Sequence, residues 1–173
     1  MFLQKDNLLI RTATPDDAPI LCRWWNDGNI MAHAGFPKGI GTTIPAVIDN
    51  LAADNNHVLM LEIDAEPVGE MNYRSVGENA VEIGIKICNP AQQGKGYGTD
   101  FLKMLIEFLF LQMGYQKIIL DTNLKNIRAQ HVYENIGFRK GAVHLDSWKD
   151  QLGEWQSSVD YHLAREEYLI TPG

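Results

Sequence analysis

The stretch Gln93-Gly94-Lys95-Gly96-Tyr97-Gly98-Thr99 stands between two strongly patterned segments. Before it, Ala80–Cys88 alternates apolar with polar or small residues, as a half-buried strand does. After it, Phe101–Met113 carries apolar residues at helical spacing, and Gly114 is a natural stop. Glycines at every second position let the backbone turn tightly and let a ligand approach its N–H groups. Because those N–H groups open a helix, the stretch predicts a cradle for a pyrophosphate.

Two well-known nucleotide loops do not fit this stretch. A Walker loop requires Gly-Lys-Ser/Thr, whereas Lys95 is followed by Gly96. The dinucleotide fingerprint requires a further glycine where Thr99 and Asp100 stand. The preceding strand also belongs to an antiparallel run and not to an opening βαβ unit. The spacing leaves a cradle of another kind, with an ordinary glycine-rich turn as the alternative.

The other segments predict a mixed sheet with helices in a single domain over residues 1–173. Their order favours an α/β or α+β fold and disfavours the regular alternation of a doubly wound fold. Residues Asn26–Pro45 are rich in glycine and proline and predict an irregular, mobile loop. Helices are predicted to begin after the caps Thr14 and Asn126. The further predicted strands are Leu8–Arg11, His57–Ile63, Val68–Tyr73, Lys117–Asp121, one from Phe138 onward and Ser158–Ala164.

Composition narrows the classes of protein. Lys plus Arg is 15 and Asp plus Glu is 22, so the formal charge is 15 − 22 = −7, which disfavours a nucleic-acid partner. Cys22 and Cys88 are too few for a disulfide framework or a zinc site, so no metal is expected. No apolar run approaches the ~18 residues that cross a bilayer, and no signal peptide is evident. We therefore expect a cytoplasmic protein without a membrane partner.

Two motifs make the chain resemble the GNAT superfamily of N-acetyltransferases. Gln93–Gly98 matches the family's Gln or Arg, two residues, Gly, one residue, then Gly or Ala. Asn126–Phe138 looks like the family's helix with Asn, Ala, Tyr and a final Gly-Phe. Within the family, the branch of ribosomal-protein N-terminal acetyltransferases and aminoglycoside 6′-acetyltransferases looks most similar. The segments that carry this likeness are Thr14-Pro15-Asp16-Asp17, Trp25-Asn26-Asp27, and Asp160-Tyr161 with Arg165-Glu166-Glu167-Tyr168.

The resemblance implies the acyl-CoA N-acyltransferase fold, a mostly antiparallel sheet in which two parallel central strands splay apart. Those strands would be Val81–Cys88 and Lys117–Asp121, with acetyl-CoA as co-substrate in the gap. The pyrophosphate would lie on the backbone of Gln93, Gly94, Lys95, Gly96, Tyr97, Gly98 and Thr99. The pantetheine arm would pair with Ile85, Lys86 and Ile87 and contact Asn126.

Three residues are candidates for catalysis of direct attack by an amine on the thioester. Tyr133 matches the family's Tyr and would protonate the leaving thiolate; its alternative role is core packing with Ala129 and Ile136. Asp121 ends a buried strand and would bind or deprotonate the amine, whereas Glu82 on the neighbouring strand is its rival. Since an ordinary Asp, with a pKa near 3.9, is a weak base, a water relay is the third possibility.

The acceptor is expected to be a small cationic amine of the aminoglycoside or polyamine kind. Its specificity would be set by two loops, Asn26–Pro45 and His144–Gln156. Alternatives are a peptide N-terminus as acceptor, a non-catalytic acyl-CoA sensor and, third, a nucleotide-binding protein. A homodimer is the default assembly. The acidic residues expected to border the acceptor are Asp27, Asp121, Asp146, Asp150 and Glu154.

Overall fold

The computed structural model describes residues 1–170 and divides the chain into two compact units. The first unit comprises residues 1–13, 54–120 and 162 onward, and the second comprises residues 14–53 and 121–161. Each unit is described by itself. The boundary passes through strands β6 (Lys117–Asn123) and β8 (Trp155–Ala164), so each unit holds part of both.

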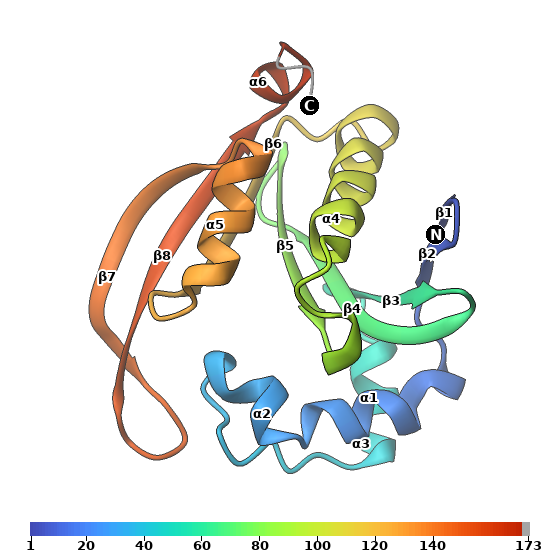
Figure 1. Ribbon diagram of the computed structural model, residues 1–173, viewed down its shortest axis with the longest axis vertical. Coiled ribbons are helices and arrows are strands. Elements are labelled where there is room, and N and C mark those ends of the chain that lie inside the picture. The colour runs from blue at the N-terminus through green and yellow to red at the C-terminus, as the bar shows by residue number, and fades with distance from the viewer. Residues whose placement is uncertain (171–173) are drawn as a thin grey trace. The chain divides into compact units, whose positions relative to one another are not determined.

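The first unit contains most of the sheet and the long central helix (Figure 1). Its other strands are β1 (Phe2–Lys5), β2 (Leu8–Thr12), β3 (His57–Ile63), β4 (Glu66–Ser75) and β5 (Ala80–Ile87). Its helices are the 3-10 turn η3 (Pro90–Gln92), α4 (Tyr97–Glu107), the π-helical turn η4 (Phe108–Gln112) and α6 (Arg165–Ile170).

The sheet confirms the mixed, mostly antiparallel fold. Its eight strands follow the order β1-β2-β3-β4-β5-β6-β8-β7, where β7 is Arg139–Lys149. Strands β1 to β5 pair antiparallel in succession, and β5 pairs parallel with β6. The parallel register joins Ala80–Glu82 to Lys117–Ile119, whereas β4 follows β5 as far as Ile87. The short parallel register is what two strands that splay apart produce.

The core of the first unit lies between the sheet and α4, which packs against β5 and β2 (Figure 1). Phe101, Leu105, Ile106 and Leu109 are wholly buried, because helical spacing places them on one side of the helix. The N-terminal end of α4 is thereby fixed where the glycine-rich turn meets the sheet. This confirms the predicted strand, turn and helix around the cradle.

The second unit contains the remaining helices and the final hairpin (Figure 1). Its helices are η1 (Pro15–Asp17), α1 (Ala18–Trp25), α2 (Gly28–Met31), η2 (Ala32–Ala34), α3 (Ile44–Leu51) and α5 (Ile127–Ile136), followed by β7 and β8.

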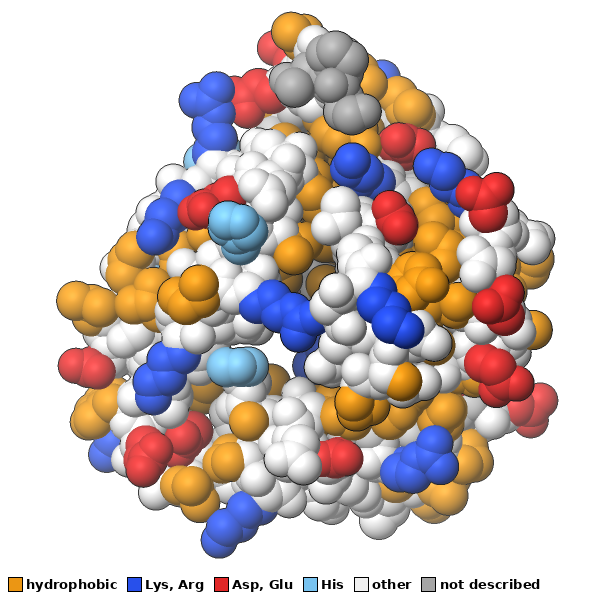
Figure 2. Space-filling model, in the orientation of Figure 1, with side chains coloured by type: hydrophobic (Ala, Val, Ile, Leu, Met, Phe, Trp, Pro, Cys, Tyr) orange, Lys and Arg blue, Asp and Glu red, His pale blue; other side chains and the backbone are white. Residues whose placement is uncertain are grey.

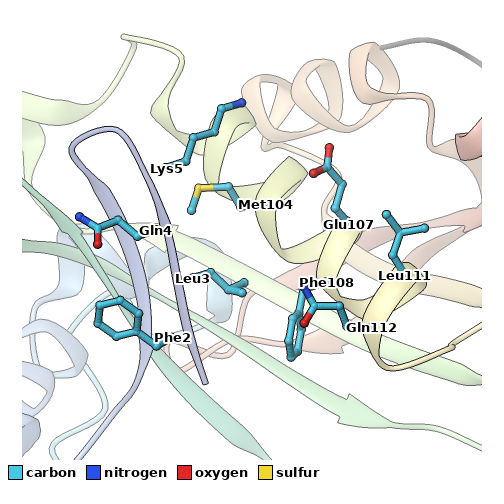
Figure 3. A pocket seen from close by; sticks show the side chains of 9 residues that line it. All are labelled: Phe2, Leu3, Gln4, Lys5, Met104, Glu107, Phe108, Leu111 and Gln112. Carbon is cyan, nitrogen blue, oxygen red and sulfur yellow. The ribbon is translucent and has the colours of Figure 1, made fainter.

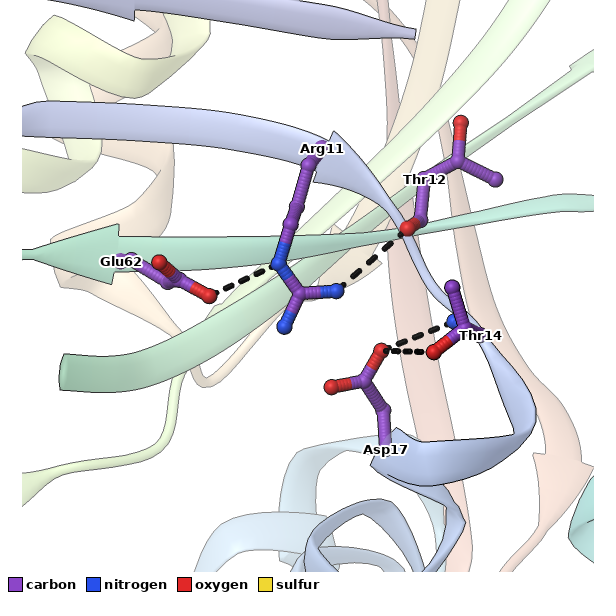
Figure 4. Close-up of polar contacts among 5 residues, drawn as sticks. All are labelled: Arg11, Thr12, Thr14, Asp17 and Glu62. Atoms are coloured by element: carbon purple, nitrogen blue, oxygen red, sulfur yellow. Dashed lines mark hydrogen bonds and ion pairs between the residues drawn. The ribbon is translucent and has the colours of Figure 1, made fainter. Parts of the chain in front are cut away.

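The predicted cap at Thr14 is confirmed. The Asp17 carboxylate accepts hydrogen bonds from the Thr14 backbone N–H at 2.8 Å and from the Thr14 hydroxyl at 3.4 Å (Figure 4). Because these bonds close the first turn, the chain enters η1 and α1 directly after Thr14. Figure 4 also shows Arg11 of the first unit, whose Nε donates to Glu62 at 2.8 Å and whose guanidinium donates to the Thr12 carbonyl.

Two of the loop predictions are wrong. Asn26–Pro45 is not irregular throughout, since it contains α2 and η2 and the start of α3. Its return is held by the Asn26 side chain, which accepts from the Thr42 N–H at 2.7 Å and donates to the Thr42 carbonyl at 3.0 Å. His144–Gln156 is mostly strand, with a turn only between Lys149 and Trp155. The strand predicted from Phe138 onward is confirmed as β7, but its extension from His144 to Lys149 was not predicted, because nearly all of β7 is exposed on both faces, which removes the alternating apolar signal.

Three elements, β1, α3 and α6, were not predicted from the sequence. Strand β1 and the C-terminal part of α4 with η4 border an open groove in the first unit (Figure 3). Its lining residues are Phe2, Leu3, Gln4, Lys5, Met104, Glu107, Phe108, Leu111 and Gln112. None of the predicted site residues lines this groove.

Acidic and basic side chains are mixed over the face of the molecule visible in Figure 2.

Among residues 1–170, no helix is both long and apolar enough to cross a membrane. The predicted cytoplasmic location remains a prediction.

Candidate active site

The glycine-rich turn leads directly into α4. Gly94 and Gly96 have φ angles of +73° and +85°, a backbone conformation that side chains rarely adopt, and Gly96 is the N-cap of the helix. A Cβ added to Gly96 or Gly98 would meet no atom within 4 Å. The glycines therefore leave open space beside the start of the helix, into which a ligand fits without moving the protein.

The backbone donors of this turn have no acceptors within the described part of the chain. Among residues 1–170, the N–H groups from Gly94 to Thr99 donate no hydrogen bond to another residue, and the first that does is Asp100, to the Gly96 carbonyl at 3.2 Å. Unpaired N–H groups at a helix start attract anionic oxygens, and the helix dipole adds to the attraction. The open space and the free donors fit the pyrophosphate of a coenzyme A thioester.

The end of β5 is tied to the same turn. The Gln93 side-chain amide donates to the Ile87 carbonyl at 2.9 Å, which joins the first residue of the motif to the strand expected to pair with the pantetheine arm. Ile85, Lys86 and Ile87 are all half-buried. The Lys86 ammonium lies 3.4 Å from the Glu70 carboxylate, so its charge is already paired on the sheet. The structure thus brings Ile87 and Gln93 together as one rigid feature.

Glu82 has a partner within its own unit. Its carboxylate lies 2.9 Å from Nε of Arg74, the residue directly opposite it on β4, and its side chain is 33% exposed. A cross-strand ion pair of this kind is a common surface feature of antiparallel sheets. The choice between Glu82 and Asp121 is not decided by this contact.

Tyr133 lies in the middle of α5 in the second unit. It is 6% exposed and packs against the rings of Phe138 and Tyr161, with ring centroids 6.0 Å and 5.7 Å apart. The helix is fixed at both ends, since the Asn126 side chain accepts from the Ala129 N–H at 3.2 Å and Gly137 closes the C-terminus with a φ of +119°. Core packing and a chemical role are therefore both available to Tyr133.

The pKa of Tyr133 is raised, as is that of its buried neighbour Tyr161. Burial raises the pKa of Tyr133 to about 12, with the nearby charge of Asp121 and then Tyr161 adding to the rise. Because the pKa is raised, Tyr133 holds its proton at every pH below about 12. Asp121 is exposed and lies within β6, two residues before its end, where the prediction had placed it at the strand end. The structure thus brings a carboxylate and a protonated hydroxyl together.

Two of the acidic residues predicted to border the acceptor, Asp27 and Asp150, form hydrogen bonds that stabilise local structure. Asp27 caps α2 by accepting from the Asn29 N–H at 2.9 Å. Asp150 closes the β7–β8 turn: it accepts from the N–H groups of Leu152 and Glu154 at 2.9 and 3.0 Å and from the Gln156 amide at 2.9 Å. Burial raises the pKa of Asp150, but these hydrogen bonds and the charge of Lys125 outweigh it and hold the pKa below its usual range.

Three polar residues of the second unit were missed from the sequence. Asn123 and Gln156 are buried, 6% and 7% exposed, and hydrogen-bonded to each other at 3.1 Å. Both lie just beyond the ends of the predicted strands, within the longer strands β6 and β8, so the sequence offered no signal for them. Gln151 gives no signal either, because the backbone groups that it contacts, at Lys38 and Gly39, lie 113 and 112 residues away in the sequence.

Comparison with known proteins identifies the family. The acetyltransferase (GNAT) domain matches residues 7–139. The chain belongs to the GNAT acetyltransferases. This confirms the resemblance drawn from Gln93–Gly98 and Asn126–Phe138, and the protein is accordingly an acetyltransferase. Membership of the GNAT family implies the use of acetyl-CoA.

The names of the GNAT relatives refer to different substrates. An uncharacterized N-acetyltransferase of Bacillus subtilis, YnaD, is 26% identical over 97% of this chain and 99% of its own. An aminoglycoside N(6′)-acetyltransferase type 1 of Klebsiella pneumoniae is 28% identical over 80% of this chain and 77% of its own. The spermidine N-acetyltransferase of Vibrio cholerae, solved with CoA and spermine, has a TM-score of 0.84 at 18% identity, over 95% of this chain and 99% of that one. At that identity, the structural likeness shows the GNAT fold alone.

Residues 1–170 hold no group of three or more His, Cys, Asp or Glu side chains arranged to hold a metal ion. The expectation of a metal-free enzyme remains a prediction.

Proposed function

We propose that this GNAT protein transfers the acetyl group of acetyl-CoA to a small cationic primary amine by direct attack in a ternary complex. The observation that carries the proposal is the open glycine-rich turn at the start of α4, where the N–H groups from Gly94 to Thr99 donate no hydrogen bond to another of residues 1–170. Asp121 and Tyr133 of the second unit are the proposed catalytic residues, and the charge of Asp121 contributes to the raised pKa of Tyr133. One supplies a negative charge for an ammonium group, and the other supplies a proton. We also propose that residues 1–173 act as one acetyltransferase domain, which is supported by a family match that draws on both units.

The cofactor side of the proposal rests on the first unit. Acetyl-CoA supplies an acetyl thioester, whose carbonyl is open to attack by an amine. The residues that would hold it are Gln93 through Thr99 at the pyrophosphate, Ile85–Ile87 along the pantetheine arm and Asn126 of the second unit. The free N–H groups from Gly94 to Thr99 support this assignment, since nothing else in the described chain satisfies them.

Asp121 would hold the acceptor amine and promote its deprotonation. A primary alkyl amine with a pKa near 10.4 is only about one part in 2,500 neutral at pH 7, whereas an N-terminal amine near 7.8 is roughly one part in seven neutral. An exposed carboxylate is therefore most useful to the first kind of acceptor. Being a weak base, Asp121 would act through a water molecule that accepts the amine proton. Glu82, whose carboxylate is paired with Arg74, is the alternative candidate for this role.

Tyr133 would donate its proton to the departing thiolate. Because its pKa lies at about 12, the hydroxyl is fully protonated throughout the working pH range. Loss of the Tyr133 proton should therefore not limit the rate between roughly pH 6 and pH 10. The pH dependence of the rate would then report the acceptor amine and not the tyrosine.

An acetyl-transfer assay tests the proposal with spermidine, an aminoglycoside and a peptide with a free N-terminus as acceptors. A small alkyl amine should gain activity steeply up to about pH 9, whereas a peptide N-terminus should level off near pH 8. The acceptor KM should rise with salt, because attraction to Asp121 is screened over about 10 Å at 0.1 M ionic strength, and the acetyl-CoA KM should rise less. Asp121→Asn should raise the acceptor KM about fivefold and reduce its salt dependence.

The outcomes separate the alternatives. A plateau near pH 8 with the peptide as the best acceptor would identify a protein N-terminal acetyltransferase instead. A neutral best acceptor with a salt-independent KM would refute the electrostatic part of the proposal. Tight acetyl-CoA binding without transfer to any amine would indicate an acyl-CoA sensor.

A further inference from the structure

A short segment of the second unit, Gly35–Gly39, is held by one side chain from a distant part of the chain. The Gln151 side chain accepts from the Lys38 N–H at 2.9 Å and donates to the Gly39 carbonyl at 3.0 Å. The Gln151 backbone N–H also donates to the Gly35 carbonyl at 2.8 Å. Because one bond uses the oxygen and another uses the nitrogen of the same amide, only a carboxamide satisfies both partners.

Apolar packing supports the same contact. Gly35 has a φ of +99°, and a Cβ placed on it would lie 2.5 Å from a ring carbon of Trp148. Trp148 is the half-buried residue in an otherwise exposed β7. The indole thus rests directly on the Gly35 backbone. Strand β7 and the turn that follows it together fix the Gly35–Gly39 segment from one side.

A second polar chain links this segment to the strand that carries Asp121. The Asn123 side-chain nitrogen donates to the Gln156 side chain at 3.1 Å and contacts the His33 carbonyl at 3.4 Å, just before Gly35. Gln156 in turn donates to Asp150, which closes the turn containing Gln151. Asn123 and Asp121 are two residues apart on β6, so their side chains leave the same face of the strand.

We propose that Gln151 is a positioning residue for the acceptor amine. It fixes the Gly35–Gly39 segment relative to Asp121, so that the acceptor meets a preformed surface in the second unit. This inference rests on the proposed function, because it assigns the segment to acceptor binding. Preorganisation of this kind improves affinity by avoiding the cost of ordering a loop when the acceptor binds.

Two variants of Gln151 separate the donor from the acceptor half of the clamp. Gln151→Ala removes both side-chain hydrogen bonds, whereas the nearly isosteric Gln151→Glu keeps the acceptor for Lys38 and loses the donor to Gly39. Gln112→Ala is the control, since Gln112 is an exposed residue of η4 in the first unit. For each variant, KM and kcat are measured with the best amine and with acetyl-CoA, together with the hydrogen exchange of the Lys38 amide.

In Gln151→Ala the acceptor KM should rise at least about fivefold, as expected from the loss of about one net hydrogen bond. The acetyl-CoA KM and kcat should stay within about twofold, and the Lys38 amide should exchange at least about fivefold faster. Gln151→Glu should change the Lys38 exchange less than Gln151→Ala does, because it keeps the acceptor for the Lys38 N–H, and Gln112→Ala should match the parent protein.

Three results would overturn the proposal. An unchanged Lys38 exchange in Gln151→Ala would show that the clamp does not hold the segment. Faster exchange with an unchanged acceptor KM would show that the segment does not serve the acceptor. Equal rises in both KM values would show a general structural role. If the parent protein acetylated no amine, the proposed function would fail and take the acceptor role with it, while Lys38 exchange would still report on the clamp.

Discussion

Two glycine-containing turns, Gly94–Gly98 in the first unit and Gly35–Gly39 in the second, use the same residue type in different surroundings. Beside Gly96 and Gly98 a Cβ would meet no atom of residues 1–170 within 4 Å, and the adjacent N–H groups donate no hydrogen bond within that part of the chain. Beside Gly35 and Gly39 a Cβ would lie 2.5 Å from Trp148 and 2.1 Å from the Asn26 carbonyl. Glycine permits a ligand to approach in the first turn and permits the protein itself to approach in the second.

The difference means that a glycine-rich stretch does not by itself reveal a binding loop. What distinguishes the two turns is whether their backbone groups are already satisfied. The Gly35 and Gly39 carbonyls and the Lys38 N–H are hydrogen-bonded to Gln151. Among residues 1–170, by contrast, the N–H groups from Gly94 to Thr99 donate to no other residue. Substitutions at the Gly94–Gly98 turn should therefore affect binding or turnover, whereas substitutions at the Gly35–Gly39 turn should affect stability.

The largest effect is expected at Tyr133, which shares a unit with the clamped segment but should act on turnover. Tyr133→Phe removes the proton and keeps the ring, so kcat should fall ~10²–10⁴-fold while acetyl-CoA binding stays unchanged. Steady-state kinetics and calorimetry measure the two quantities. Tyr161→Phe is the matched control, because Tyr161 is also buried with a pKa raised to about 12, yet its hydroxyl donates to Glu134 at 3.0 Å. Full turnover in Tyr133→Phe would leave that residue a role in packing only.

The next largest effect is expected in the cradle. Gly98→Val places a branched side chain in the open space at the start of α4, so the dissociation constant for acetyl-CoA should rise at least about tenfold while the melting temperature hardly changes. Gly98 suits this test better than Gly96, because the φ of +85° at Gly96 would strain any side chain. Gly141→Ala in β7 is the control, since its Cβ would meet Asp160 at an ordinary 3.4 Å. Unchanged affinity in calorimetry would argue against the cradle.

The third effect is expected in the clamped turn, and it concerns stability and not binding or turnover. Gly35→Ala forces a methyl group against Trp148 at a positive φ, which should cost about 2–4 kcal/mol and lower the melting temperature by roughly 5–10 °C. Gly41→Ala isolates the backbone part of this cost, because Gly41 has a φ of +76° and nothing within 4 Å of its Cβ. Differential scanning calorimetry compares the two. Equal losses would show that Trp148 adds nothing to the clamp.

Local periodicity accounts for the elements that were predicted well. Strand β3 was predicted at its observed bounds, and Gly137 ends α5 as expected, because apolar runs and caps act within a few residues. Strands without an apolar face, such as β7, lack that signal. The segment Asn26–Pro45 was predicted as irregular because its short helices are held by side chains such as Asn26 and not by periodic apolar contacts.

The local structure of the candidate site, too, was predicted well only where its residues are close together in the sequence. The strand, turn and helix around Gln93–Thr99 were predicted because a strand, three glycines and a helix start follow one another directly in the sequence, and the binding role of this turn stays a prediction. The choice between Glu82 and Asp121 stayed open, because it depends on a neighbour on another strand. Arg74 occupies that place beside Glu82, and Tyr133 feels the charge of Asp121 from a different helix.

By itself, the sequence determined the acetyltransferase family, the mixed sheet and the glycine-rich turn between β5 and α4, since each depends on residues close together in the chain. Only the tertiary structure decided that the donors of Gly94–Thr99 are unpaired, that Tyr133 keeps its proton to a pH of about 12, and that Gln151 clamps Gly35–Gly39. These properties arise from burial, charge and hydrogen bonds between residues up to 113 positions apart. Local sequence patterns do not predict such distant partners, because many pairings of distant residues are compatible with the same helices and strands.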